Sequence, residues 1–191
     1  MRHSARYNRT TSRTLPGARG SIRARPFGAR LHVNSDQQHL RAACRYVEQG
    51  LFEEAQAELE QIDPSCRDLP DLLATRIPYY QALEKWDLMA IVAKKLTEWR
   101  PETPENFIDW AYAARRGESI HQAHAILTRA ASLHPTNATI QFNLACCEAQ
   151  LGNLDPAKTC LRRAIEIEGK FRVMALEDPD LEPLRASLAA D

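Results

Sequence analysis

The chain has 191 residues, 44% of them hydrophobic, and its 25 basic and 25 acidic side chains leave no net charge at pH 7. This length allows one sizeable core, and the sequence lacks both a run of about 18 apolar residues and a secretory signal, so we expect no membrane span. Five cysteines without a CxxC pair exclude a zinc site of ordinary spacing and argue against a disulfide framework. We therefore expect a soluble cytoplasmic protein with buried, reduced thiols.

The first 35 residues differ from the rest in charge. They carry eight arginines and no acidic residue, which leaves 17 basic against 25 acidic side chains in the remainder. Their apolar surface is too small to offset the entropy of ordering, so we expect a disordered Arg-rich tail over 1–35. Three interpretations stay open for this tail: a plain extension, a transit peptide directing the chain to an organelle, or an arm for nucleic acid or a membrane surface.

From Asp36 onward the pattern becomes helical and repeats every 34 residues. Gly50 and Gly152 mark a turn inside the first and the last unit, so each unit is predicted to hold two helices. Four apolar columns recur at this spacing without an insertion: Phe52, Trp86, Ile120 and Leu154; Ala55, Met89, Ala123 and Ala157; Leu59, Ala93, Leu127 and Leu161; Ile62, Leu96, Ala130 and Ala164.

The first two units, 36–69 and 70–103, contain prolines where a regular helix pair avoids them. Pro64 predicts that the second helix of the first unit ends at Ile62 or Asp63. Pro78 lies inside the first helix of the second unit, where it removes a backbone hydrogen bond and predicts a kinked or split helix. We expect these units to be joined less regularly than the next two.

The last two units, 104–137 and 138–171, follow the pattern more closely. Thr136 or Asn137 is predicted to cap the first helix of the fourth unit. Asp155 is predicted to cap its second helix, with Pro156 in the first helical position, where a missing N–H costs nothing.

The chain closes with a further amphipathic stretch within 172–191. Leu181, Leu184 and Leu188 fall on one helical face, and Asp180 before them is a suitable cap. This spacing predicts a C-terminal capping helix that covers the apolar end of the fourth unit.

A 34-residue helix–turn–helix unit with glycine in the turn and small residues in the second helix resembles the tetratricopeptide repeat. The unit that carries the resemblance best has Leu144, Ala145, Gly152, Leu154, Ala157, Leu161 and Ala164 at family positions. The resemblance covers 36–171 and implies an all-α, right-handed superhelix of about four such repeats, with the capping helix at its end. It implies no cofactor, and because the sequence contains no known catalytic motif we do not expect an enzyme.

Members of this family commonly receive a peptide or helix of another protein in a concave groove built from the first helices. The resemblance therefore implies an adaptor or chaperone-like scaffold that binds an apolar or amphipathic segment, with large anchors in the middle of the groove and arginines at one rim. The groove positions carry over to Leu40, Cys44, Ala74, Ile108, Tyr112, Arg115, Arg116, Phe142 and Cys146.

Several alternatives stay open at this point. The groove is filled either by a partner, by the chain's own C-terminal helix, or by a second copy in a self-associated form. The alternative functions are a nucleic-acid-associated protein that acts through its tail and a structural subunit of a larger assembly. No metal is expected, because His121 and His124 form a solvated pair at outward positions. Cys146 and Cys147 should face different surroundings, since helical neighbours point about 100° apart.

Overall fold

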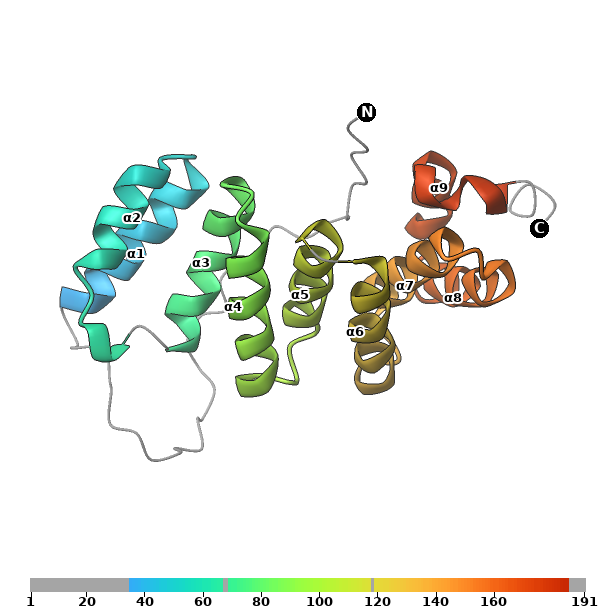
Figure 1. Ribbon diagram of the computed structural model, residues 1–191, viewed down its shortest axis with the longest axis horizontal. Helices are drawn as coiled ribbons and strands as arrows, with labels where there is room; N and C mark the ends of the chain where they lie inside the picture. Colours follow the sequence, from blue (N-terminus) through green and yellow to red (C-terminus); the bar gives the residue numbers. More distant parts are fainter. Residues whose placement is uncertain (1–34, 67–68, 118, 186–191) are drawn as a thin grey trace. The chain divides into compact units, whose positions relative to one another are not determined.

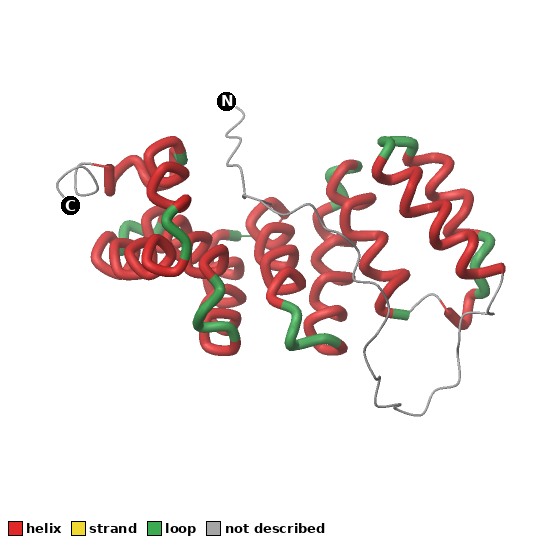
Figure 2. The backbone as a smooth tube through the Cα atoms, turned by 180° about the vertical axis from the view of Figure 1, so that it is seen from behind, coloured by secondary structure: helices red, strands yellow, loops and turns green. Residues whose placement is uncertain are grey.

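The computed structural model describes residues 35–66, 69–117 and 119–185, and all secondary structure within these ranges is helical (Figures 1 and 2). The described residues form two compact units that divide between Leu72 and Leu73. Residues 1–34 of the expected tail and residues 186–191, which include Leu188, lie outside the described part of the chain. The all-α fold expected from the sequence is confirmed.

The first unit contains α1 (Ser35–Glu48), α2 (Phe52–Glu60) and the short 3-10 helix η1 (Pro64–Cys66). α1 packs against α2, and the hydrogen bond of His39 Nδ1 to Glu58 Oε2, at 2.6 Å, joins them. α2 ends two residues before the predicted Ile62, because the chain turns into η1 at Pro64. The apolar core of this unit consists of Ala43, Leu59, Ile62, Cys66 and Leu72.

The second unit continues the series of helices up to residue 185. Successive helices from α4 to α8 pack against one another, and a last short helix packs mainly against α7. The elements are α3 (Pro70–Ala82), which begins in the first unit, α4 (Trp86–Trp99), α5 (Pro104–Gly117), α6 (Ile120–Leu133), α7 (Ala138–Gln150), α8 (Leu154–Ile167), α9 (Lys170–Glu177) and the 3-10 helix η2 (Pro179–Leu184).

The 34-residue spacing of the sequence reappears in the helix bounds. The second helices α2, α4, α6 and α8 begin at Phe52, Trp86, Ile120 and Leu154. Small residues of the second column, such as Ala123 and Ala157, are fully buried, because neighbouring helices press closely on that face. A larger side chain there would overpack the contact by about 1–3 kcal/mol.

The turns inside the pairs use a left-handed backbone. Gly50 has φ of 76° and Gly152 has φ of 82°, as glycine in these turns allows. Glu84, at the same repeat position between α3 and α4, has φ of 52° although it carries a side chain. A non-glycine residue in this conformation costs roughly 1–2 kcal/mol, so the α3–α4 turn stores strain that the α7–α8 turn avoids.

Some local predictions are corrected by the structure. Pro78 does not split its helix, because α3 runs without a break from Pro70 to Ala82. α8 begins one residue before the predicted cap, so Asn153 is its N-cap residue and Pro156 is the third residue of the helix. Pro156 is still tolerated, since the first four N–H groups of a helix have no helical acceptor. The Asn137 cap is confirmed by its side chain, which accepts a hydrogen bond from Ile140 N–H at 2.9 Å.

The end of the chain also differs from the prediction of one capping helix. The structure has α9, a break at Asp178, and then η2. The break follows from Pro179, since the residue before a proline avoids the helical conformation. Asp178 accordingly has an extended backbone and caps η2 with its side chain.

Candidate functional site

The first helices α5 and α7 contact each other within the second unit. On α5, Phe107, Ala111 and Ala114 are buried in a core shared with α6 and α7. Ile108 and Tyr112 lie on a neighbouring face of the same helix and are half-buried, and Arg116 is exposed. This face, which we call the α5 face and define by Ile108, Tyr112 and Arg116, is one part of the predicted partner-binding surface.

An aromatic pair flanks the α5 face. The rings of Tyr112 and Trp86 meet edge to face, with centroids 5.5 Å apart, and the Arg116 guanidinium lies 4.9 Å from the Trp86 ring centroid. Gly117 allows this close approach, because a Cβ at this position would lie 3.1 Å from Cβ of Trp86. The family positions carried over from the sequence do not include Trp86, because it opens a second helix. Its signal was that it is the largest residue in a column that otherwise holds Phe52, Ile120 and Leu154.

The equivalent part of α7 is covered by the end of the chain. Phe142 is 1% exposed and Cys146 is 3% exposed, and both belong to a core that also contains Leu181 and Leu184 of η2. Phe171 of α9 packs on Phe142 with a ring-centroid distance of 5.0 Å. One of the alternatives drawn from the sequence, that the chain fills its own surface, therefore holds for this part of α7, which α9 and η2 cover together.

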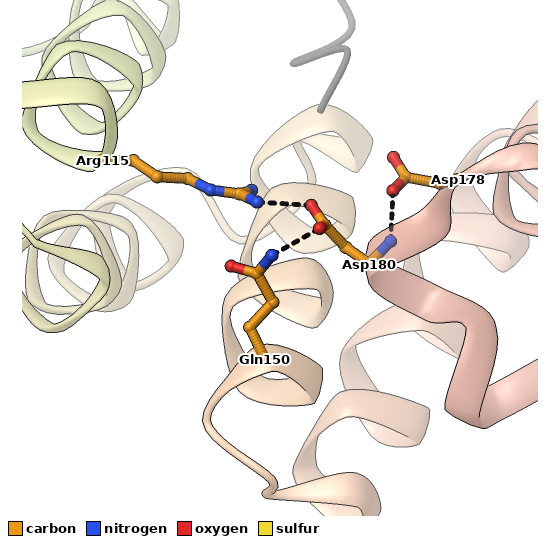
Figure 3. Close-up of polar contacts among 4 residues, drawn as sticks. All are labelled: Arg115, Gln150, Asp178 and Asp180. Atoms are coloured by element: carbon orange, nitrogen blue, oxygen red, sulfur yellow. Dashed lines mark hydrogen bonds and ion pairs between the residues drawn. The ribbon is translucent and has the colours of Figure 1, made fainter. Parts of the chain in front are cut away.

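Asp180 fixes this covering segment to two different helices (Figure 3). Its Oδ2 lies 2.6 Å from a guanidinium nitrogen of Arg115 on α5, and its Oδ1 accepts a hydrogen bond from the side-chain amide of Gln150 on α7. The side chains of Arg115 and Asp180 are 11% and 8% exposed, so the ion pair is largely shielded from water. We call residues 178–184 the C-terminal clasp.

The electrostatics of the clasp disfavour further negative charge. Burial raises the pKa of the Cys146 thiol well above its usual value, and the carboxylates of Asp178 and Asp180 add to this, against an opposing effect of Arg115. Burial also raises the pKa of Asp178, although a hydrogen bond from the backbone N–H of Asp180 lowers it in part. Cys146 is accordingly a protonated, unreactive thiol while the clasp is closed.

Cys146, Asp178 and Asp180 also form a group of potential metal ligands among the described residues, with atoms within 4.8 Å of one another. Arg115 already supplies the positive charge that a cation would bring, and the thiol favours its protonated form. The donor set therefore matches an internal ion pair better than a metal centre.

The two histidines of α6 have different surroundings. His121 is exposed, as predicted, whereas Nε2 of the half-buried His124 bonds Glu148 Oε1 at 2.8 Å and links α6 to α7. Burial raises the pKa of Glu148, but the hydrogen bonds from His124 and Asn153 outweigh it, so the pKa is lowered. Cys147 lies in a different core from Cys146, as predicted.

The remaining predicted site residues lie elsewhere. Leu40 packs on the core of the first unit, and Cys44 on the same helix is half-buried. Ala74 lies on α3 and packs against the core around Met89 in the second unit. A binding role for these residues stays a prediction.

No helix in the described ranges is long and apolar enough to cross a membrane. The Arg-rich segment on which the nucleic-acid alternative depends lies outside those ranges. The surfaces described below are therefore those of the repeat helices.

Several solved structures of other proteins share this fold. The solved structure of MamA has a TM-score of 0.68 at 15% identity, covering 83% of this chain and 90% of that one. YrrB, described as a TPR protein with an unusual peptide-binding site, has a TM-score of 0.62 at 17% identity, covering 76% of each chain. TTC0263 of Thermus thermophilus, a thermophilic TPR protein, has a TM-score of 0.54 at 19% identity, covering 81% of this chain and 97% of that one.

The comparisons by sequence match a shorter part of the chain than the comparisons by structure. No curated protein matches the sequence significantly. Residues 118–188, which span α6 to η2, match the family model of the tetratricopeptide repeat. The likeness to solved structures extends the same helical-repeat fold over most of the remaining chain. Residues 118–188 therefore carry the sequence signature of the tetratricopeptide repeat, and the chain as a whole shares the fold of solved TPR proteins.

Proposed function

We propose that the chain is a non-catalytic protein-interaction module, an adaptor or scaffold, which binds an apolar or amphipathic segment of another protein on the α5 face. The observation that carries this proposal is the group of Tyr112, Trp86 and Arg116: an edge-to-face aromatic pair with an exposed guanidinium beside it. Tyrosine, tryptophan and arginine are the side chains that most often dominate binding energy at protein interfaces.

Two further observations support the proposal. The repeat fold is shared with YrrB, whose structure is described by a peptide-binding site. Arg116 lies in the last turn of α5 and is exposed, so it gives the rim of the α5 face a positive charge that complements an acidic group of a partner. Fold likeness alone does not define a ligand, so the proposal depends on the side chains of α5.

We also propose the cytoplasm as the compartment. All five cysteines are free thiols, and Cys66, Cys146 and Cys147 are buried. Thiols in this state are typical of a reducing environment.

The proposal is tested by affinity capture from lysate of the native cell, followed by mass spectrometry of the bound proteins. A Tyr112→Ala, Arg116→Gln double variant should lose at least about 30-fold in affinity for the captured partner, on the scale of interface hot spots. Trp99→Ala is the matched control, because it removes an exposed aromatic side chain from α4 outside the α5 face. Equal capture by both variants would exclude the α5 face as the binding surface.

A further inference from the structure

The C-terminal clasp occupies the part of α7 that is equivalent to the α5 face. It is short, from Asp178 to Leu184, and it packs mainly against α7, with smaller contacts to α8 and α9. The residues of a segment that already covers a predicted binding surface indicate which side chains that surface can bind.

The apolar half of the contact comes from two leucines. Leu181 and Leu184 are completely buried and share a core with Phe142, Cys146 and other apolar residues of α7 and α8. They are three positions apart, so one turn of a 3-10 helix places both side chains on the same side. The surface beneath the clasp therefore accepts a pair of leucines on one helical turn.

The polar half of the contact comes from one aspartate. Asp180 pairs with Arg115 and accepts a hydrogen bond from Gln150 (Figure 3). These partners come from α5 and α7, and both side chains point toward the carboxylate. Paired and hydrogen-bonded in this way, a shielded carboxylate is well accommodated, and an apolar residue in its place would remove the ion pair with the guanidinium.

We propose that the surface beneath the clasp is a receptor for an acidic partner segment in which an aspartate is followed by leucines one and four positions later. The C-terminal clasp, with Asp180, Leu181 and Leu184, is the internal occupant of this receptor. The inference goes beyond the proposed function, because it concerns the surface of α7 beneath the clasp and not the α5 face. The external ligand of this receptor is a segment of a different protein, and this segment displaces the clasp when it binds.

An internal occupant lowers the apparent affinity for the partner segment. A receptor that is open in only a small fraction of molecules binds with a dissociation constant raised by the inverse of that fraction. Weakening the clasp without altering Arg115, Gln150 or Phe142 should therefore make the same surface bind an added segment more tightly.

The experiment uses the full-length chain and a fluorescent peptide with the sequence of residues 178–185, DPDLEPLR. Fluorescence anisotropy compares the wild-type chain with Asp180→Asn, which removes the charge of the internal occupant. The expected result is at least about tenfold tighter binding to Asp180→Asn. Binding should be lost when the third residue of the peptide is asparagine, and when Arg115→Gln is added to the protein.

Matched variants separate this result from general effects of charge. Glu182→Gln makes the same change in charge on an exposed side chain of the same turn, so peptide binding should stay at the wild-type level. Arg162→Gln on the exposed side of α8 is the control for Arg115→Gln. If Asp180→Asn loses helicity, Leu184→Ala replaces it, because this change weakens the clasp from its apolar side. The peptide is then titrated into Leu184→Ala, and tighter binding than to the wild type is again expected.

Three results would overturn the inference. The first is no peptide binding to either opened variant, and the second is binding that Arg115→Gln leaves unchanged. The third is a concentration-dependent dimer of the wild-type chain that excess peptide dissolves, which would assign the surface to a second copy. Failure of the proposed function is a separate result: partner capture would be unaffected by the Tyr112→Ala, Arg116→Gln double variant while the peptide titration succeeds.

Discussion

α5 and α7 present the same three repeat positions in two different states. Ile108, Tyr112 and Arg116 on α5 correspond, at a spacing of 34 residues, to Phe142, Cys146 and Gln150 on α7. The α5 residues are half-buried or exposed, whereas Phe142 and Cys146 are almost completely buried and Gln150 bonds Asp180. The helices are alike, so the C-terminal clasp makes the difference. A repeat position thus defines the direction of a side chain, and the neighbouring segments decide whether that side chain is covered or partly exposed.

The largest effect should come from truncating the covered member of an equivalent pair. Phe142→Ala removes a side chain that packs on Phe171 and the clasp, and we expect a loss of about 3–5 kcal/mol in the free energy of unfolding. Ile108→Ala, at the same repeat position of α5, should cost only about 1–2 kcal/mol, because Ile108 is partly exposed already. Urea unfolding followed by circular dichroism measures both, and equal losses would contradict the difference in burial.

A smaller effect is expected at the two arginines in the last turn of α5. Arg115→Gln breaks a shielded ion pair with Asp180, and we expect a loss of about 1–3 kcal/mol. Arg116→Gln should cost less than about 1 kcal/mol, because Arg116 is exposed and contacts the Trp86 ring.

Alkylation of Cys146 distinguishes loosening of the clasp from a general loss of stability. Its thiol lies beneath the clasp and has a raised pKa, so opening should expose it and favour the reactive thiolate. Peptide mapping after iodoacetamide treatment should show faster modification of Cys146 in Arg115→Gln, with Cys147 as the internal reference. Equal acceleration at both cysteines would mean global unfolding instead.

The comparison between regular and irregular parts extends to the turns before α8 and α4. Gly152→Ala places a Cβ in a left-handed turn with nothing within 4 Å of it, so the expected loss of about 1 kcal/mol comes from the backbone alone. Glu84→Gly, at the equivalent turn, should relieve strain and gain about 0.5–1 kcal/mol. Thermal unfolding of both variants checks the signs, and a loss in Glu84→Gly would show that its side chain stabilises the turn.

The repeat was predictable because it depends on local chemistry. Close helix packing requires a small residue, as at Ala123 and Ala157, and a left-handed turn favours glycine, as at Gly50 and Gly152. Both requirements recur at a fixed spacing in the sequence. Pro78 predicted a kinked or split helix, and the split is wrong, because the packing of Leu73 and Ile77 in the surrounding core outweighs one lost hydrogen bond. The kink stays a prediction.

The site was predictable only in part. The spacing placed Phe142 and Arg115 on the first helices, but it did not predict the pairing of Arg115 with Asp180, which lies 65 residues further along the chain. A contact between residues so far apart depends on tertiary packing, and no periodic signal reports it. The group around Trp86 was missed for the same reason, since its pairing with Tyr112 joins the second helix of one unit to the first helix of the next.

The smallest effect concerns the charge of Asp178 inside the clasp. Burial raises its pKa, the negative charge of Asp180 adds to this, and Arg115 and Arg185 oppose it. An acid with a raised pKa contributes stability that is present below its ordinary pKa of 3.8 and is lost as the pH rises through the raised value. At pH 7 the ionised Asp178 therefore weakens the clasp.

Asp178→Asn should remove this cost and keep the cap, because the amide oxygen can still accept the hydrogen bond from Asp180 N–H. We expect the variant to exceed the wild type in stability at pH 7 by less than about 1 kcal/mol, since the side chain is only partly buried. The difference should vanish below pH 3, where Asp178 is neutral in both the folded and the unfolded chain. Unfolding of both proteins between pH 3 and pH 7, with Glu182→Gln as the control, measures this change. A gain that persists at pH 3 would assign the effect to the amide rather than to the lost charge.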